Sequence, residues 1–276
     1  MQKISGVQIA SQIIENLKKQ LKPNKILAAI LVGDNQTSIS FLKQKEKTAQ
    51  ELGVDFRIYK FPIDIKNDDL RQEIVHISGQ KPIGGVIVQL PLPEHLNRHY
   101  ALNAIPRGKD VDVLGERALG AFYTDRNPVL PPVVEVVKSI LTTCNAQLVT
   151  LKVAIVGQGF LVGKPIFVWL KDKVKELYIL GHESDLAIIK NCDLVITATG
   201  KANLIKPEML KENASVIDFG YSFNENKIQG DFDASLIENC KLKIENSWYT
   251  PTPGGTGPIL VAKIFENFYK LCQTQK

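Results

Sequence analysis

The chain has 276 residues, of which 44% are hydrophobic and 23% are charged, and its formal net charge at pH 7 is +5. This composition is ordinary for a globular protein of one large or two modest domains. The basic charge forms no block of like sign, so we expect no nucleic-acid partner. No apolar run approaches the roughly 20 residues that cross a bilayer, and no signal peptide opens the sequence. These features predict a cytoplasmic protein without a membrane partner.

The residues that commonly bind metals or form disulfides show no grouping. The cysteines are widely separated and lack a C-x-x-C pair, so we expect free thiols in a reducing compartment. The histidines lack the spacing of metal ligands, and we predict no metal site. These residues are Cys144, Cys192, Cys240 and Cys272, with His76, His95, His99 and His182.

The first half of the sequence alternates helical and strand-like patterns. Helical periods and capping signals predict helices, and short apolar or alternating runs predict strands. Such alternation predicts a parallel sheet, in which ligands bind beyond the carboxyl ends of the strands. The predicted helices cover residues 7–21, 38–52 and 67–77, and the predicted strands cover residues 25–32, 54–61 and 85–90.

Ser38, Phe41 and Lys45 lie near one face of the second predicted helix, because residues three and four apart are neighbours on a helix. An aromatic ring beside a lysine suits a flat ring substrate and a proton-transferring amine. A core phenylalanine and a solvated lysine would give the same spacing, so both interpretations stay open.

Two further polar residues of this half are candidates for chemistry. Gln89 stands near the end of an apolar strand, where a buried amide needs partners. It can bond a lysine amine, a ligand or the following loop. Asp112 belongs to the segment Lys109-Asp110-Val111-Asp112, and paired carboxylates in loops are commonly caps or solvated turns. Asp112 can instead accept hydrogen bonds from the amino group and ring N–H of a pterin-like heterocycle.

The second half begins after a proline-containing link at residues 126–132. Its strands and helices alternate as a Rossmann-type domain requires. Strands are predicted at residues 153–156, 177–180, 193–197 and 215–219, and helices at residues 133–141, 166–174 and 259–271.

Glycines follow the first strand of this half, at Gly157, Gly159 and Gly163. They let the backbone turn sharply and approach a ligand, and the helix start behind them suits a diphosphate. The spacing G-x-G-x-x-x-G differs from the usual dinucleotide motif, so a plain strand-to-helix turn is the alternative. Glu183 follows the second strand, where the acid that binds a ribose 2′-OH belongs. A rigid loop of glycines and prolines at residues 249–258 is either a binding loop or a helix entry.

Several motifs occur in an order that is typical of one family. They are Ser38-x-x-Phe41-x-x-x-Lys45, Val86–Pro93, Lys109–Asp112, Val162–Pro165, Ala198–Lys201, Val216–Gly220, Gly230–Asp233 and Thr250–Pro258. On these motifs the sequence resembles the bifunctional 5,10-methylenetetrahydrofolate dehydrogenase/5,10-methenyltetrahydrofolate cyclohydrolase family over nearly its whole length. The Q-L-P-L-P and T-P-x-P-G-G-x-G-P strings are the most specific.

The resemblance implies an α/β protein of two domains with a cleft between them. An N-terminal α/β folate-binding domain would cover residues 1–139 and 257–276, and a Rossmann-type NAD(P)-binding domain would cover residues 140–256. The implied activities are oxidation of 5,10-methylenetetrahydrofolate to 5,10-methenyltetrahydrofolate and hydrolysis of the latter to 10-formyltetrahydrofolate. Tetrahydrofolate derivatives are the expected small-molecule partners, and family members are usually homodimers.

The resemblance also implies roles for individual residues. Lys45 matches the catalytic lysine of the family, Gln89 the glutamine that holds it, and Asp112 the aspartate that grips the pterin. The expected folate-binding residues are Ser38, Phe41, Pro253, Gly254 and Gly255. The expected cofactor is NADP or NAD, held by Gly157, Gln158, Gly159, Gly163, His182, Glu183, Thr199, Gly200 and Thr256.

The sequence departs from the family pattern on the folate side. Phe41 replaces a usual tyrosine and keeps the ring without the hydroxyl. Residues 113–116 replace G-F-H-P, and the region of residues 130–132 replaces P-C-T-P. A monofunctional dehydrogenase of the same fold is therefore an alternative. An idle folate- or nucleotide-binding homologue and another Rossmann oxidoreductase, such as a shikimate dehydrogenase, are further alternatives.

A departure on the cofactor side concerns the choice of nicotinamide. Gln158 stands where NADP-dependent members carry an arginine, and Glu183 adds an anion nearby. A carboxylate repels a 2′-phosphate. We therefore expect that NAD is favoured or that both cofactors are used.

Overall fold

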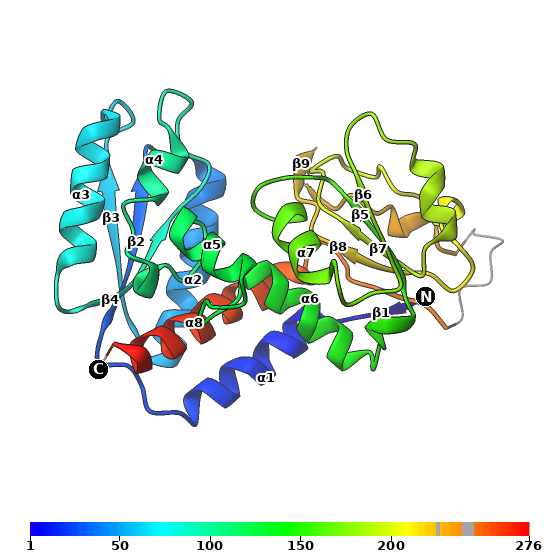
Figure 1. The fold of residues 1–276 in the computed structure, drawn as a ribbon, viewed down its shortest axis with the longest axis horizontal. Coiled ribbons are helices and arrows are strands. Elements are labelled where there is room, and N and C mark those ends of the chain that lie inside the picture. The colour runs from blue at the N-terminus through cyan, green and yellow to red at the C-terminus, as the bar shows by residue number, and fades with distance from the viewer. Residues whose placement is uncertain (225–226, 239–245, 276) are drawn as a thin grey trace. The chain divides into compact units, whose positions relative to one another are not determined.

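The computed structural model describes residues 1–224, 227–238 and 246–275 of the chain (Figure 1). These residues fold into two compact units. The three-stranded unit comprises residues 11–132 and 261–276, and the six-stranded unit comprises residues 1–10 and 133–260. Cys144, Cys192 and Cys272 are free thiols, and Cys240 lies outside the described residues.

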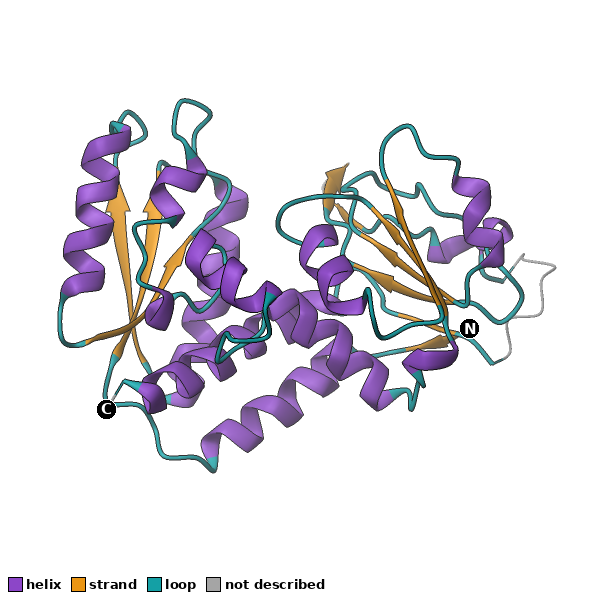
Figure 2. Ribbon diagram, in the orientation of Figure 1, coloured by secondary structure: helices purple, strands orange, loops and turns teal. Residues whose placement is uncertain are grey.

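The three-stranded unit is built on a parallel sheet with the strand order β3-β2-β4. Its strands are β2 (Ile26–Val32), β3 (Asp55–Phe61) and β4 (Ile83–Val88). The central strand β2 is buried along its whole length, which explains its uninterrupted apolar sequence. Helices α2 (Gln36–Leu52) and α3 (Asn67–Gly79) follow β2 and β3, and helices lie on both sides of this sheet (Figure 2).

Helix α2 has well-defined ends. The side chain of Asn35 accepts a hydrogen bond from the Ser38 amide at 2.9 Å and caps the N-terminus. Gly53 adopts a φ of 65° and closes the C-terminus, which confirms the predicted glycine cap. The buried face of this helix carries both Ser38 and Lys45.

Shorter helices and one long helix complete the three-stranded unit. They are α4 (Arg98–Leu102), α5 (Glu116–Tyr123) and most of α8 (Thr256–Thr274). Asn267 of α8 is fully buried, and its side-chain amide donates to the carbonyl oxygens of Val111 at 2.9 Å and Leu130 at 2.8 Å. This asparagine fixes the segment that contains Asp112 to the last helix.

The six-stranded unit contains a sheet with the order β1-β11-β8-β7-β5-β6, in which every described strand pair is parallel. The chain moves to β6 on one side of β5 and then to β7 on the other, which makes β5 a topological switch point. The strands of this sheet are β1 (Gln2–Lys3), β5 (Lys152–Val156), β6 (Glu176–Leu180), β7 (Leu194–Thr197), β8 (Ser215–Asp218) and β11 (Trp248–Tyr249). The other α-helices among the described residues are α1 (Gly6–Lys18), α6 (Pro132–Thr143) and α7 (Gly163–Leu170).

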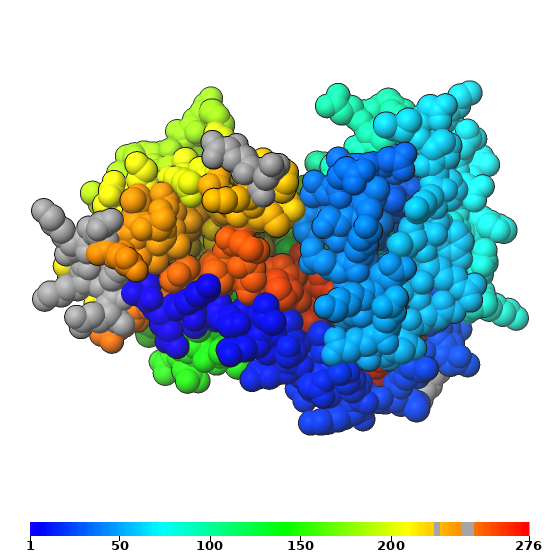
Figure 3. Space-filling view, turned by 180° about the vertical axis from the view of Figure 1, so that it is seen from behind, coloured from blue at the N-terminus to red at the C-terminus, as the bar shows by residue number. Residues whose placement is uncertain are grey.

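The start of the chain is an edge strand of this sheet. The Ile4 amide donates to the Tyr249 carbonyl, and the Gly6 amide donates to the Gly254 carbonyl, each at 2.9 Å. In Figure 3 the first residues (dark blue) lie beside the 248–255 segment (orange). These backbone hydrogen bonds attach the start of the chain to the glycine-rich loop at residues 249–258.

The predicted class, α/β with parallel sheets in two domains, is confirmed. The strand predicted at residues 85–90 is β4, so Gln89 lies just past the strand. The helix predicted at residues 166–174 is α7 and ends at Leu170. The sequence pattern does not predict β1, β11 or the antiparallel pair of β9 (Ser222–Asn224) and β10 (Lys227–Gln229), because two or three residues carry little periodicity. None of the described helices is long and apolar enough to cross a membrane.

Replacing Asn267 tests how strongly α8 holds the 110–115 segment. Asn267→Ala leaves two carbonyl groups without a donor, and we expect a loss of about 1–3 kcal/mol in the free energy of unfolding. The measurement is urea unfolding of the intact chain. Asn24→Ala, at an exposed position of the same unit, is the control and should change stability by less than about 0.5 kcal/mol. Equal stability of both variants would contradict the anchoring role.

Candidate active site

Lys45 and Gln89 form a buried pair in the three-stranded unit. Helix α2 directs Lys45 inward, where the residue is 8% exposed. Its Nζ donates a hydrogen bond of 2.7 Å to Oε1 of Gln89. The Gln89 amide in turn donates through Nε2 to the Leu90 carbonyl at 2.8 Å, which orients the oxygen toward the lysine. Of the partners left open by the sequence, Gln89 therefore bonds both the lysine amine and the following loop.

Burial shifts the pKa values of Lys45 and Asp112 in opposite directions, and the charge of each group opposes the shift of the other. Burial lowers the pKa of the Lys45 amine, and the nearby Asp112 carboxylate opposes the change. Burial raises the pKa of Asp112, and the Lys45 charge opposes that rise. A lysine with a lowered pKa can give up and regain a proton closer to neutral pH than a solvated lysine can. The geometry thus provides an amine for proton transfer with a carboxyl group in its field.

Ser38 and Phe41 lie on the same helix as Lys45. Ser38 is 1% exposed, and its Oγ is buried without a hydrogen-bond partner among the described residues. Phe41 is half-buried. A buried hydroxyl needs a partner, so the Ser38 side chain has hydrogen-bonding capacity that a ligand can satisfy.

Asp110 is a buried carboxyl that sequence reasoning did not single out. It is 1% exposed, and its Oδ2 accepts hydrogen bonds from the amides of Leu114 at 3.0 Å and Gly115 at 2.8 Å. Burial raises its pKa to about 7 against these two hydrogen bonds, and the charge of Asp112 adds to the rise. The paired-carboxylate motif was the available signal, but it did not show that Asp110 accepts hydrogen bonds from the amides that follow it.

The glycines after β5 serve different purposes. Gly157 has a φ of 111° and lies against the Ala198 backbone, and Gly163 at the start of α7 lies against the Gly157 carbonyl. Neither position has room for a Cβ atom. A Cβ at Gly159, in contrast, would meet no described atom within 4 Å. Two glycines therefore shape the turn, and the third leaves open space where a ligand can approach the backbone.

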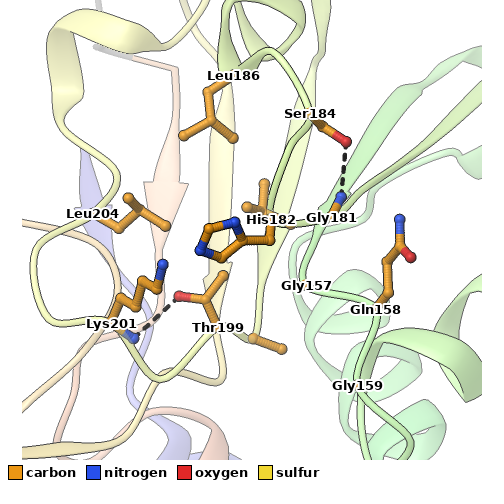
Figure 4. Close-up of a pocket in the computed structure, with 12 residues that line it drawn as sticks. Gly157, Gln158, Gly159, Gly181, His182, Ser184, Leu186, Thr199, Lys201 and Leu204 are labelled. Atoms are coloured by element: carbon orange, nitrogen blue, oxygen red, sulfur yellow. Dashed lines mark hydrogen bonds between the residues drawn. The ribbon is translucent and has the colours of Figure 1, made fainter.

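A cavity of about 390 Å³ opens beyond the carboxyl ends of β5, β6 and β7 (Figure 4). In that view His182, Thr199 and Lys201 lie on one side of the glycine turn, and Gln158 extends toward Gly181 on the other. A Cβ at Gly181 would lie 2.9 Å from Nε2 of Gln158. The cavity is lined by Val156, Gly157, Gln158, Gly159, Gly181, His182, Ser184, Leu186, Ala198, Thr199, Lys201 and Leu204.

Some of the expected cofactor residues stand outside this lining. Glu183 is exposed and does not line the cavity, whereas its neighbour Ser184 does and accepts a hydrogen bond from the Gly181 amide at 2.9 Å. Gly163 and Gly200 also lie outside the lining. Gly163 is at the start of α7, and Gly200 follows Thr199. His182 and Glu183 are both exposed, so the path of the chain after β6, which no motif records, decides which side chains face the cavity.

A network of buried carboxylates holds the loops around the cavity. Oδ2 of Asp231 accepts from the Thr197 hydroxyl and the Thr199 amide, both at 2.6 Å. Asp218 accepts from the amides of Gly220 and Phe232, and burial raises its pKa to about 7. The Thr256 hydroxyl donates to the Asp218 carbonyl at 2.9 Å, so Thr256 braces this network and does not line the cavity.

The proline and glycine loop belongs to the six-stranded unit. The Thr252–Pro253 peptide bond is cis, and Gly254 has a φ of 94°. Gly255 packs against the Pro251 carbonyl, where a Cβ atom would not fit. The loop leads directly into α8, which begins at Thr256, and its role in binding stays a prediction.

The six-stranded unit has the features of a Rossmann-type dinucleotide-binding domain: a switch point at β5, a glycine turn and a cavity beyond the strand ends. Comparison with known proteins identifies the family. The model for the catalytic domain of tetrahydrofolate dehydrogenase/cyclohydrolase matches residues 4–112, and the model for the NAD(P)-binding domain of the same family matches residues 131–276. The chain belongs to the tetrahydrofolate dehydrogenase/cyclohydrolase family.

Relatives match the chain from end to end. The bifunctional protein FolD of Hydrogenobaculum sp. (strain Y04AAS1) is 33% identical over 97% of each chain. The crystal structure of the bifunctional FolD methylenetetrahydrofolate dehydrogenase/cyclohydrolase from Campylobacter jejuni gives a TM-score of 0.91 at 29% identity, covering 99% of this chain and 98% of that one. A 5,10-methylenetetrahydrofolate dehydrogenase from the silkworm Bombyx mori gives 0.86 at 26%, covering 100% and 99%. The predicted family is confirmed.

The electrostatic link between Lys45 and Asp112 can be measured directly. Lys45→Met removes the positive charge that lowers the pKa of Asp112, so this pKa should rise further. The measurement is a pH titration of the carboxyl resonances in protein labelled with ¹³C at aspartate, assigned with Asp112→Asn. Lys47→Met removes an exposed lysine of the same helix and should leave the titration unchanged. An unaltered Asp112 pKa in Lys45→Met would show that the two groups do not interact.

Proposed function

We propose that this protein oxidises 5,10-methylenetetrahydrofolate to 5,10-methenyltetrahydrofolate with a nicotinamide cofactor and hydrolyses the product to 10-formyltetrahydrofolate. The observation that carries the proposal is the buried Lys45–Gln89 pair with Asp112 in its field, in a chain of this family. In this proposal the three-stranded unit binds the folate through Ser38, Phe41 and Asp112. The six-stranded unit binds the dinucleotide at the glycine turn.

The residues around the cavity fit a dinucleotide. Gly159 leaves the backbone open, the α7 start follows it, and the volume of about 390 Å³ is that of a small-molecule site. The cofactor, when bound, accepts a hydride from the one-carbon bridge of the folate. Asp231 fixes the Thr199 amide, and Gly157 shapes the turn, so the chain's part in this step is binding and orientation.

The second step needs proton transfer, which the first does not. Loss of a hydride from the methylene bridge leaves a methenyl cation and moves no proton. Attack of water on that carbon, followed by ring opening, requires a base and then an acid. In our proposal the amine of Lys45 performs these transfers, and Gln89 orients it without adding charge.

A monofunctional dehydrogenase is the second candidate. It is favoured by Phe41, which lacks the hydroxyl of the usual tyrosine, and by the altered residues 113–116. Both changes lie on the proposed folate side, where the hydrolytic step takes place.

Replacing Lys45 separates the two activities. Lys45→Met should lower the cyclohydrolase rate by about 10²- to 10⁴-fold, the usual contribution of general acid–base catalysis, and should lower the dehydrogenase rate much less. The assays supply 5,10-methenyltetrahydrofolate for hydrolysis and 5,10-methylenetetrahydrofolate with each nicotinamide cofactor for oxidation. Lys47→Met is the control. Wild-type protein that oxidises but does not hydrolyse above background would establish the second candidate, and wild-type protein inactive in both assays would refute both.

We further propose that NAD is favoured or that both cofactors are used. Gln158 lies over Gly181 at the end of β6, where the ribose of a dinucleotide binds in such folds. It offers an amide and no positive charge to a 2′-phosphate. The exposed Glu183 stands close by in the chain and adds to the repulsion of an anion.

An arginine at position 158 should change this preference. Gln158→Arg adds a charge-assisted hydrogen bond to a 2′-phosphate, worth about 1.5–3 kcal/mol, so the ratio of kcat/KM for NADP to that for NAD should rise roughly tenfold to hundredfold. Gln147→Arg, an exposed position outside the cavity, is the matched control. A strong NADP preference in the unaltered protein would overturn the proposal.

The cellular compartment and the oligomeric state of the protein are also proposals. We infer a cytoplasmic homodimer from the resemblance to the family and from the free thiols at Cys144, Cys192 and Cys272. Burial raises the pKa of each of these thiols to about 11, which favours the unreactive, protonated form.

A further inference from the structure

The turn that carries Asp112 contains a backbone conformation that its residue type disfavours. Val113 has a φ of 57°, in the left-handed region, and is fully buried. For a β-branched residue this region is a rare and strained choice. The other described residues with positive φ are glycine, asparagine or aspartate, which adopt it more readily. Such strain persists only where the surroundings impose it.

The carboxylate of Asp110 is positioned to impose it. Its Oδ2 accepts from the amides of Leu114 and Gly115, the two residues that follow Val113. The Asp110 carbonyl accepts from the Val113 amide at 3.4 Å, so the chain must fold back on itself within a few residues. Oδ1 of Asp110 is buried without a hydrogen-bond partner among the described residues. The hydrogen bonds that hold this side chain in the interior are therefore those of Oδ2.

The N-terminal end of the turn is fixed independently of the Asp110 carboxylate. Asp110 forms an isolated β-bridge with Val86 of β4, and the Asn267 side chain donates a hydrogen bond to the Val111 carbonyl. The Lys109 amine donates to the carbonyls of Ser78 and Gln80 at the end of α3. With one end anchored in this way, the Asp110 carboxylate needs only to draw in the amides of residues 114 and 115 to set the conformation of residues 112 and 113.

We propose that Asp110 is a positioning residue, whose carboxylate holds Val113 in the left-handed conformation and thereby presents Asp112 to Lys45 and the substrate. Its effect on activity rests on the proposed function. Its effect on the turn does not. A glycine at position 113 would adopt the same φ without strain, so it should make the Asp110 carboxylate largely dispensable.

A double-mutant cycle tests this coupling. Asp110→Ala should lower kcat/KM by at least about tenfold, through a higher KM for 5,10-methylenetetrahydrofolate and with the KM for the dinucleotide unchanged. Combined with Val113→Gly, the same substitution should cost less than about threefold, because the turn then forms without the carboxylate. The control is Asp193→Ala, which removes a carboxylate that bonds the Lys152 amide in the six-stranded unit. Val113→Gly should not rescue that variant.

Urea unfolding of the same variants reports on the turn without any assay. The shift in unfolding midpoint caused by Asp110→Ala should be at least halved in the Val113→Gly background. This readout stands even if the wild-type protein proves inactive, in which case the proposed function fails and the positioning role is still decided. Additive effects of the two substitutions on midpoint would overturn the proposal.

Asp110→Asn provides a milder test should the alanine variant fold poorly. Its amide oxygen can accept both backbone hydrogen bonds, so kcat/KM should stay within a few-fold of wild type. A loss as large as that of alanine would show that the negative charge, and not the hold on the turn, is what Asp110 supplies, and would refute the proposal.

Discussion

The proposed proton transfer depends on bringing one ammonium group, that of Lys45, out of water. Taking a charged amine into the interior costs free energy, and the cost appears as a lowered pKa of Lys45. A carboxylate in direct contact would cancel that effect by stabilising the charged form. Gln89 is the contact partner instead, and a neutral amide holds the nitrogen in place while leaving the desolvation dominant. Asp112 acts at longer range and limits how far the pKa falls.

Removal from water also matters for the buried carboxyls of both units, which have a structural role. Asp231 and Asp218 accept hydrogen bonds from backbone amides and a threonine hydroxyl near the cavity at the ends of β5, β6 and β7, and Asp110 accepts from two amides in the turn after Asp112. A carboxylate accepts several hydrogen bonds from one point, so it can define a loop with few residues. The raised pKa of about 7 for Asp110 and Asp218 is the consequence of keeping such groups away from water.

The sequence was sufficient for the class of fold and the family, and it offered Gln89 as one possible partner of Lys45. Continuous apolar runs predicted β2, β5 and β7, since strands buried on both faces need no alternation. The spacing of Ser38, Phe41 and Lys45 predicted one helix face, which α2 confirms for the two buried members. Gln89 was recognised because an amide in an apolar run must be bonded, although the strand itself ends one residue earlier.

What the sequence could not give depends on contacts between distant segments. Glu183 and Ser184 are adjacent in the chain, and only the path after β6 decides that the serine faces the cavity. Asp110 and Asp112 look equivalent in the sequence, but in the structure Asp110 accepts hydrogen bonds from the amides of Leu114 and Gly115, and its neighbour Val111 is held by Asn267. Short strands such as β1 exist because a partner such as β11 pairs with them, which no local pattern encodes.

The residue at position 113 shows how a departure from a family pattern is to be weighed. The family pattern has glycine where this chain has valine, and the φ of 57° explains why glycine is suited to the position. Valine adopts this φ here, and hydrogen bonds made by Asp110, Lys109 and Asn267 hold the segment around it. A substitution that looks disruptive in the sequence is therefore absorbed as local strain, with the side chain of valine filling buried space that glycine would leave empty. The departure bears on how rigidly Asp112 is held, and it leaves the buried lysine, its glutamine and the aspartate in place.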